Sequence, residues 1–185
     1  MQNTIRNQCK NARSEMSGDE RVAASAKIAE NVIHSPWFQR SKTIACYLPA
    51  PGEVDTRRII ARAWRMKKRI FAPVVEKNGH LSFRAMNAET ALYKNNFGLY
   101  EPGDEEIIRP RDLDIVITPL VAFDSKKQRI GMGGGYFDRT FSFLANRNTY
   151  LRPKLIGVAF SCQKVDEIPA NPWDIPLFAV VTENS

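Results

Sequence analysis

The segment from Arg129 to Arg139 constrains the fold of this chain most, because it gathers four of the ten glycines within five residues. Glycine lacks a Cβ atom, so such a run can adopt positive φ values and bring backbone N–H groups close to a ligand. Successive inward-facing amides form an anion-binding concavity, and a helix that starts there adds its positive end. The glycine run therefore indicates a phosphate-binding loop, with a flexible surface turn as the alternative.

Charged and aromatic side chains flank these glycines. Arg129 and Arg139 are suited to bidentate contacts with phosphate, and Asp138 is suited to holding a divalent cation on the same phosphates. The spacing matches neither the G-x-x-x-x-G-K-[ST] phosphate loop nor the G-x-G-x-x-G dinucleotide motif. Two aromatic residues and an acid directly follow the glycines, at 136–138, which disfavours a plain linker. From the residues alone, we interpret the segment as a nucleotide-phosphate loop.

Length and composition narrow the class of protein. A chain of 185 residues with 43% hydrophobic and 25% charged residues suits one globular domain, covering residues 1–185. No apolar run approaches the roughly 20 residues of a membrane span, and the polar N-terminus lacks the apolar region of a signal peptide. We therefore expect a cytoplasmic protein. Three scattered cysteines and two histidines disfavour both a disulfide framework and a Cys/His metal site.

The net charge of +7 is compatible with a polyanionic partner or simply with a basic surface. The basic residues are dispersed except for the cluster at 65–69, which falls where a helix is expected to end. Cations are favoured there by the helix dipole, so we interpret this cluster as a solvated helix end and not as a nucleic-acid patch. A positive field also suits a small ligand that carries several negative charges.

Short apolar runs alternate with amphipathic helical patterns along the chain. An apolar run of a few residues indicates a buried strand, and helices between such strands indicate an α/β sheet covered on both faces. Asn78-Gly79, between two strand patterns, predicts an antiparallel hairpin, so the expected sheet is mixed. The predicted strands lie at residues 43–48, 69–75, 81–85, 114–119, 154–160 and 178–182, and the predicted helices lie at 3–16, at 17–33, after Thr56 and from about residue 135.

Local signals set several element boundaries. Ser17 and Glu20 form a capping-box signature at the start of the second helix. Thr56 is expected to cap the third helix with its side chain. Pro73 suggests that the strand at 69–75 ends or turns there.

The string from Asp114 to Asp124, together with the segment 129–139, closely resembles the 5-formyltetrahydrofolate cyclo-ligases. The shared pattern is a strand, P-x-x-A-F-D, a short polar turn and R-[LI]-G-x-G-x-G-[YF]-[YF]-D. The resemblance covers nearly the whole chain, and residues 98–102 match the family's G-x-x-E-P element. It implies a single three-layer α/β/α, Rossmann-like domain with a mostly parallel, mixed sheet.

The resemblance also implies a reaction. ATP and Mg²⁺ would drive the conversion of 5-formyltetrahydrofolate to 5,10-methenyltetrahydrofolate, with release of ADP and phosphate. An N-formyl oxygen is a poor leaving group, and its phosphorylation by ATP makes it a good one. N10 can then attack the activated carbon and expel phosphate. Phosphoryl transfer needs mainly positioning and charge neutralisation, which suits backbone amides, arginines and Mg²⁺.

The site residues implied by the resemblance fall into four groups. ATP binding is assigned to Gln2, Arg6, Arg129, Ile130, Gly131, Met132, Gly133, Gly134, Gly135, Tyr136 and Phe137. Substrate binding is assigned to Leu48, Glu53, Met132, Gly133, Gly134, Gly135 and Tyr136. The catalytic residues are Arg129, Tyr136 and Asp138, and the magnesium ligands are Asp138 and Asp174.

Some of these positions have another interpretation or depart from the family. From the residues alone, Glu53 would be a solvated acid, and Trp173-Asp174 would be a packed turn. Gln2 stands where a lysine is common, and Gly134 where some members carry a lysine. Phe137 replaces a frequent tyrosine, so a hydroxyl role there is not expected.

The resemblance implies only small-molecule partners, namely ATP and 5-formyltetrahydrofolate with or without a polyglutamate tail, and we expect no nucleic acid, no membrane and no obligatory protein partner. One alternative is a folate- or nucleotide-binding regulator with degenerate chemistry. A second is a sugar-phosphate isomerase or CoA-transferase-like enzyme, which would act without ATP. An RNA-binding protein is the third, and its binding would weaken steeply with salt.

Overall fold

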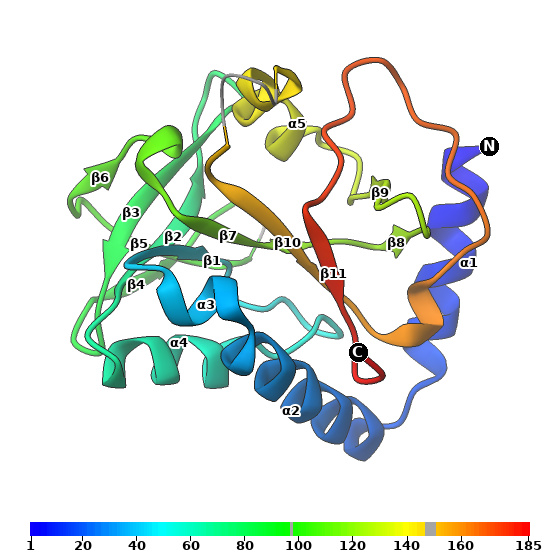
Figure 1. Ribbon diagram of the computed structural model, residues 1–185, viewed down its shortest axis with the longest axis horizontal. Coiled ribbons are helices and arrows are strands. Elements are labelled where there is room, and N and C mark those ends of the chain that lie inside the picture. Colours follow the sequence, from blue (N-terminus) through cyan, green and yellow to red (C-terminus); the bar gives the residue numbers. More distant parts are fainter. Residues whose placement is uncertain (97, 147–150) are drawn as a thin grey trace.

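A seven-stranded sheet forms the centre of the computed structural model, which describes residues 1–96, 98–146 and 151–185 (Figure 1). In spatial order its strands are β11 (Ala179–Val181), β10 (Lys154–Val158), β7 (Ile115–Pro119), β1 (Thr43–Cys46), β2 (Arg69–Val75), β3 (Leu81–Met86) and β6 (Ile107–Ile108). The first five are parallel to one another, whereas β3 runs antiparallel to β2 and to β6. The mixed, mostly parallel sheet is confirmed, and the three-layer, Rossmann-like description stays a prediction.

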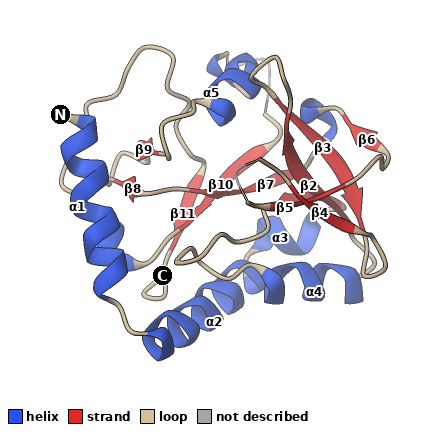
Figure 2. Ribbon diagram, turned by 180° about the vertical axis from the view of Figure 1, so that it is seen from behind, coloured by secondary structure: helices blue, strands red, loops and turns tan. Residues whose placement is uncertain are grey.

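Helices surround this sheet (Figure 2). They are α1 (Gln2–Glu15), α2 (Gly18–His34), α3 (Pro36–Arg40), α4 (Arg57–Arg65) and α5 (Tyr136–Thr140), with short 3₁₀ turns η1 (Pro110–Asp112), η2 (Ser142–Ala145) and η3 (Ser161–Gln163). Two small hairpins complete the fold, β4 (Leu92–Lys94) with β5 (Tyr100–Pro102) and β8 (Ala122–Phe123) with β9 (Arg129–Ile130). The described helices include none that is long and apolar enough to cross a membrane.

Both faces of the sheet are buried, as the continuous apolar strands predict. Ile44 and Cys46 face a core built with α2 and α4, whereas Ala45 between them faces a second core. Phe141 and Leu144, which follow α5, fill that second core and are almost fully buried. The glycine-rich segment is therefore anchored to the sheet by the residues directly after it.

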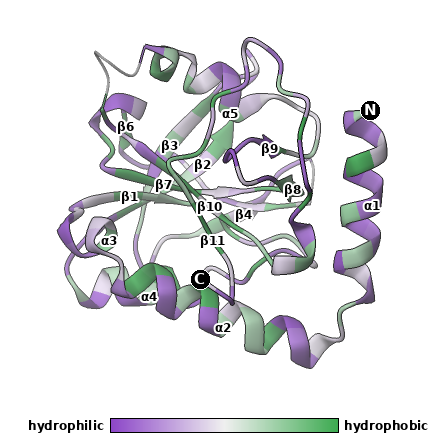
Figure 3. Ribbon diagram, turned by 45° about the vertical axis from the view of Figure 1, so that its right-hand side comes forward, coloured by the Kyte–Doolittle hydropathy of each residue, from purple (hydrophilic) through white to green (hydrophobic). Residues whose placement is uncertain are grey.

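The helix α1 lies across the edge where the parallel strands end (Figures 1 and 3). It is predominantly hydrophilic, and Cys9 is its one buried residue among those described. Cys9 and the half-buried Ile5 pack against Val121, against Ala122 of β8 and against Ile130 of β9. This contact places the first turns of α1 beside the start of the glycine run.

Two local predictions differ in outcome at the helix starts. The capping box of α2 is confirmed, because Glu20 N–H donates to Ser17 Oγ at 3.2 Å and Ser17 N–H donates to Glu20 Oε2 at 2.7 Å. The prediction for Thr56 is wrong, since its hydroxyl makes no capping bond to α4. It donates instead to the carbonyl of Tyr47 at 2.7 Å, which ties the loop after β1 back to the strand.

The prediction that the strand ends or turns at Pro73 is also wrong. β2 continues to Val75, and Pro73 pairs with Phe83 of β3. The physical reason lies on the other side of β2, where β1 pairs only as far as Phe71. Pro73 lies beyond that pairing, at a free edge, so its missing N–H removes no bond to β1.

The basic cluster at 65–69 is a helix end, as predicted. α4 ends at Arg65, and Lys67 adopts a left-handed conformation with φ of 56°. Lys68 Nζ donates to the carbonyls of Gln39 and Ser41, at the end of α3. Arg69 pairs with Glu106. Several of these cations therefore already have partners within the fold.

Candidate active site

A cavity of about 490 Å³ lies where four segments meet: the start of α1, the tip of the β2–β3 hairpin, the glycine loop with α5, and residues 171–175. Nine of the predicted site residues line it: Gln2, Arg6, Arg129, Ile130, Gly131, Gly133, Gly135, Asp138 and Asp174. Segments separated by more than one hundred positions in sequence thus contribute to one site.

The glycine loop needs its glycines for different physical reasons. Gly133 and Gly135 have φ values of 112° and 65°, which residues with a Cβ rarely adopt. Gly134 has no such backbone requirement, but a Cβ there would lie 2.4 Å from the ring of Tyr136. At Gly131 a Cβ would meet open space. The conformation of the loop thus depends mainly on the residues at 133–135.

A helix begins after Gly135, as predicted, but α5 has only five residues. So short a helix has a small macrodipole, and its contribution to binding an anion is correspondingly small. Positive charge in the cavity comes instead from arginine side chains on α1, β9 and α5.

Arg129 and Asp138 form the buried centre of the site. Arg129 Nη2 donates to Asp138 Oδ1 at 2.8 Å, and Arg129 Nη1 donates to the carbonyl of Ile175. The backbone N–H of Ile175 also donates to Asp138 Oδ1, at 3.1 Å. Burial lowers the pKa of the Arg129 guanidinium, while the Asp138 carboxylate opposes that shift. This network joins the glycine loop to the segment at 171–175.

Asp138 and Asp174 face the same cavity as possible magnesium ligands. Asp174 Oδ2 accepts hydrogen bonds from the backbone and the side chain of Asn171, at 2.8 and 3.2 Å. Within the described part of the chain, Asp138 Oδ2 and Asp174 Oδ1 have no hydrogen-bond partner. Mg²⁺ is commonly held by one or two carboxylates together with substrate phosphates, so this donor set fits that ion. The described residues contain no cluster of three acids, histidines or cysteines that would form a cage by itself.

The first turns of α1 reach the glycine loop. Arg6 Nε donates to the carbonyl of Gly131 at 2.9 Å, and its guanidinium lies over Gly133. Gln2 Nε2 donates to the carbonyl of Pro169 at 2.8 Å. Both side chains line the cavity, so α1 supplies a cation and an amide to the same cavity as Asp138.

Leu48 and Glu53 lie elsewhere, in the loop after β1, and the cavity lining does not include them. Glu53 Oε2 accepts a hydrogen bond from the Ala50 N–H at 3.0 Å. Burial raises the pKa of the Glu53 carboxyl, and the Ala50 N–H and Arg13 oppose that shift. Arg13 lies beside this loop, near Gly52, two helical turns beyond Arg6. The two predicted subsites therefore lie near opposite ends of α1, separated by roughly 10 Å along its axis.

Four more predicted residues lie outside the cavity lining: Met132, Gly134, Tyr136 and Phe137. Met132 is largely exposed at the tip of the loop. Tyr136 and Phe137 are partly buried against the second core, where Phe137 stacks on Phe141. Phe137 thus packs, in keeping with the absence of a hydroxyl.

Among the other residues that line the cavity, Arg139 joins the hairpin tip to the glycine loop. Its Nε donates to the carbonyl of Gly79 at 2.9 Å and its Nη2 donates to the carbonyl of Gly134 at 2.6 Å. Its guanidinium also lies 5.2 Å from the centre of the Tyr136 ring. The sequence marked Arg139 only as a phosphate clamp. Its contact with Gly79 depends on the position of a hairpin tip 60 residues away.

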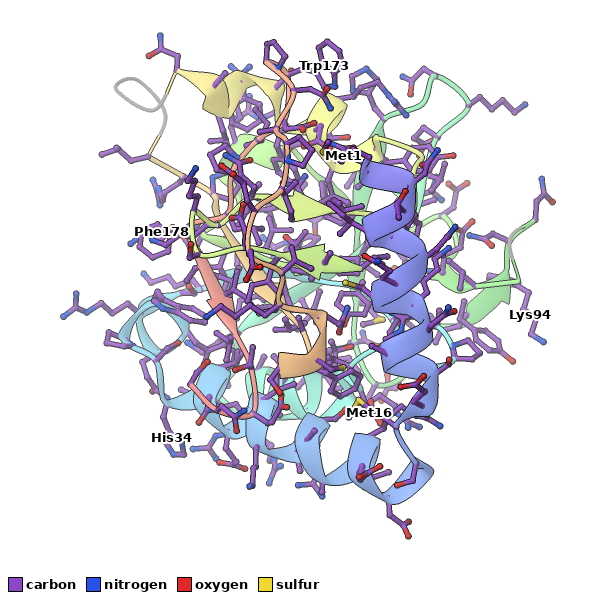
Figure 4. The ribbon with its side chains drawn as sticks, turned by 90° about the vertical axis from the view of Figure 1, so that its right-hand side faces the viewer. Met1, Met16, His34, Lys94, Trp173 and Phe178 are labelled. Atoms are coloured by element: carbon purple, nitrogen blue, oxygen red, sulfur yellow. The ribbon has the colours of Figure 1, made fainter. Side chains whose placement is uncertain are left out.

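His80, Ser142, Ala145, Asn171, Trp173 and Ile175 complete the lining. Trp173 is the most informative of these, because its side chain is 68% exposed. The interpretation of Trp173-Asp174 as a packed turn is therefore wrong for the tryptophan. Figure 4 shows Trp173 at the same end of the molecule as Met1.

Comparisons with known proteins extend over the whole fold. The family model described as the 5-formyltetrahydrofolate cyclo-ligase family matches residues 1–183. The 5-formyltetrahydrofolate cyclo-ligase of Escherichia coli K12 is 36% identical, with 92% of this chain and 93% of that protein covered. The enzyme of the same name from Haemophilus influenzae is 31% identical, over 96% and 95% of the two chains. The solved structure of Aquifex aeolicus 5,10-methenyltetrahydrofolate synthetase superposes with a TM-score of 0.85 at 32% identity, covering all of this chain and 90% of that one.

Proposed function

Because the chain belongs to the 5-formyltetrahydrofolate cyclo-ligase family, we propose that its cavity binds ATP beside a bound 5-formyltetrahydrofolate. The family reaction closes the folate to 5,10-methenyltetrahydrofolate. One observation carries the assignment to this cavity: the glycine loop, Arg6, Arg129 and two carboxylates converge on it from distant parts of the chain. Glycine-loop amides and arginines are groups that bind phosphate, and the carboxylates suit its metal ion.

The residues divide the work of phosphoryl transfer among them. Backbone N–H groups at 131–135 and the guanidinium of Arg6 bind the triphosphate, and Asp138 and Asp174 would hold the Mg²⁺ ion. When bound, Mg²⁺ neutralises charge on the phosphates. Arg129 acts mainly by fixing Asp138, since its guanidinium is buried and already bonded to that carboxylate. Its positive charge also stabilises the phosphoryl group as it is transferred.

The folate occupies the space along α1 in this proposal. Glu53, with Leu48 beside it, holds the pterin end through hydrogen bonds from ring N–H groups to its carboxylate. Tyr136 and the exposed tip of the glycine loop lie toward the formyl group. The formyl oxygen attacks the γ-phosphorus of ATP and ADP leaves. N10 then bonds to the formyl carbon and gives up its proton to solvent, and the carbon–oxygen bond breaks to release phosphate.

The test is a mixing assay with purified protein, 5-formyltetrahydrofolate, ATP and Mg²⁺, followed by the near-ultraviolet absorbance of the methenyl product. We expect product only when ATP and Mg²⁺ are both present. Binding of both ligands without product would identify a degenerate regulator instead. Product formed without ATP would overturn the proposed mechanism.

Asp138→Asn provides the residue-level test. The amide keeps the shape of the side chain but loses the charge that holds both Mg²⁺ and Arg129. We expect turnover to fall at least a hundredfold, as for loss of a strong electrostatic contact in a site, while the Kd for 5-formyltetrahydrofolate changes little. Unchanged turnover at saturating magnesium would reject the assignment of Asp138.

A further inference from the structure

Most of the indole surface of Trp173 is not packed against the rest of the protein. It is 68% exposed, yet it lines the cavity that holds the glycine loop. Exposing so large an apolar side chain forfeits the free energy that its burial would contribute. An aromatic face left open at the wall of a binding cavity is suited to a flat, apolar ligand surface.

The turn that carries Trp173 is held in place before any ligand arrives. Asp174 N–H donates to the carbonyl of Asn171 at 3.0 Å, and Asp174 Oδ2 accepts from the Asn171 N–H at 2.8 Å. Pro172 occupies the second position of this four-residue turn, where its fixed φ is favoured. Two hydrogen bonds between Asn171 and Asp174, together with the proline, therefore restrict the backbone of the segment that carries the indole.

The position of Trp173 also separates it from the predicted folate subsite. Figure 4 shows Trp173 at the same end of the molecule as Met1, where α1 begins, with Met16 at the opposite end of α1. The loop that contains Glu53 lies beside Arg13, toward the Met16 end. Trp173 is thus on the side of the cavity away from the predicted pterin subsite and adjacent in sequence to Asp174.

From these observations we propose that Trp173 is the base platform of the site, on which the adenine ring of ATP stacks while the glycine loop binds the phosphates. This inference rests on the proposed ATP dependence and adds a binding residue for the nucleoside. Stacking uses the π face of the base, which every nucleobase has, so the platform accepts other purines as well.

The first experiment measures binding of Mg·ATP and of magnesium tripolyphosphate by calorimetry. Loss of one base–aromatic stack weakens binding about tenfold or more. We therefore expect Trp173→Ala to weaken ATP binding by that factor and to leave tripolyphosphate binding unchanged. Trp173→Phe retains an aromatic face and should recover most of the ATP affinity. Phe178→Ala, a change at a second exposed aromatic that lies outside the cavity lining, is the matched control and should bind ATP like the wild type.

Fluorescence and kinetics give independent readouts. ATP should quench tryptophan emission in the wild type, and this component should be absent in Trp173→Phe. Trp173→Ala should raise the KM for ATP about tenfold, with kcat and the KM for the folate little changed. Thermal unfolding of each variant checks that the exposed substitution leaves the fold intact.

The outcomes distinguish this inference from the function on which it rests. Wild-type protein that neither binds nor uses ATP would overturn both. Wild-type protein that binds ATP while Trp173→Ala binds it equally well would overturn only the base platform. Equal losses for ATP and tripolyphosphate, or a shift confined to the KM for the folate, would do the same.

Discussion

At the scale of single residues, Thr140 shows how one side chain fixes the site to the sheet. Its buried hydroxyl oxygen accepts a hydrogen bond from the Leu81 N–H at 2.8 Å, which joins α5 to β3. Thr140→Val keeps the shape but leaves that buried N–H without an acceptor, so we expect the free energy of unfolding to fall by about 1–3 kcal/mol. Thr140→Ser keeps the acceptor and should lose less. Urea unfolding of the two variants compares them, and equal stability would argue against this role of the hydrogen bond.

Glu53 is a predicted site residue whose contribution to stability should depend on pH. Burial raises its pKa in the folded protein, so the folded state binds the proton more tightly than the unfolded state. Stability is therefore greatest below the ordinary glutamate value of about 4.3 and falls as pH rises through the raised pKa. We expect Glu53→Gln to unfold at a higher temperature than the wild type at pH 7, with the difference shrinking toward pH 4.

The same variant should bind the folate less well. A neutral amide cannot replace a charge-assisted hydrogen bond, so we expect the KM for 5-formyltetrahydrofolate to rise about tenfold. A gain in stability at pH 7 together with this loss would mean that the buried charge is retained for binding. A pH-independent difference in unfolding temperature would contradict the first expectation, and an unchanged KM would contradict the second.

At the scale of elements, the glycine loop can be tested by comparing two of its own positions. Gly133→Ala forces a side chain into φ of 112°, whereas Gly131→Ala adds a Cβ that meets open space at an ordinary backbone angle. Strain of this kind costs roughly 1–3 kcal/mol. We expect the alanine at 133 to lower kcat/KM for ATP at least tenfold and the alanine at 131 to have the smaller effect. Steady-state kinetics would contradict this if the order were reversed.

A structural feature could be predicted from the sequence where residues a few positions apart determine it, and could not where distant residues determine it. The capping box of α2 and the hairpin turn at Gly79 are decided by residues a few positions apart, and both were confirmed. The continuation of β2 through Pro73 depends on where β1 stops pairing, and the hydroxyl of Thr56 turns to a carbonyl nine residues earlier. Neither cause is visible in a local pattern.

The same difference between local and long-range determinants applies to the candidate site. The glycine loop was recognised from adjacent residues, and the family resemblance added α1 and Asp174. The structure brings these together in one cavity, whereas Glu53 lies outside its lining. The hairpin tip and the exposed face of Trp173 belong to the cavity only because distant segments meet there, so no spacing in the sequence marks them.

At the scale of the whole molecule, the three cysteines differ in how much of the protein must unfold before a thiol reagent can reach them. Cys162 is exposed, Cys9 lies on the buried face of α1, and Cys46 is fully buried with a pKa raised to about 12 by desolvation. Because α1 is mostly polar and is held by few apolar contacts, it should detach more readily than the sheet unfolds. We expect a thiol reagent to modify Cys162 first, Cys9 more slowly, and Cys46 only on global unfolding.

Bound nucleotide should slow the modification of Cys9 and, because global unfolding also releases the ligand, that of Cys46, while the exposed Cys162 reacts at an unchanged rate. Gln2 and Arg6 stand on α1 and line the cavity, so ATP bound there stabilises the docked helix by mass action. At a concentration of Mg·ATP 100-fold above its Kd, opening that requires release of the ligand should slow Cys9 modification up to about a hundredfold. Peptide mass spectrometry of the labelled protein measures each site, with Cys162 as the internal control. Cys9 modification unaffected by nucleotide would mean that α1 does not close over the bound ligand and that its first turns are not part of the ATP site.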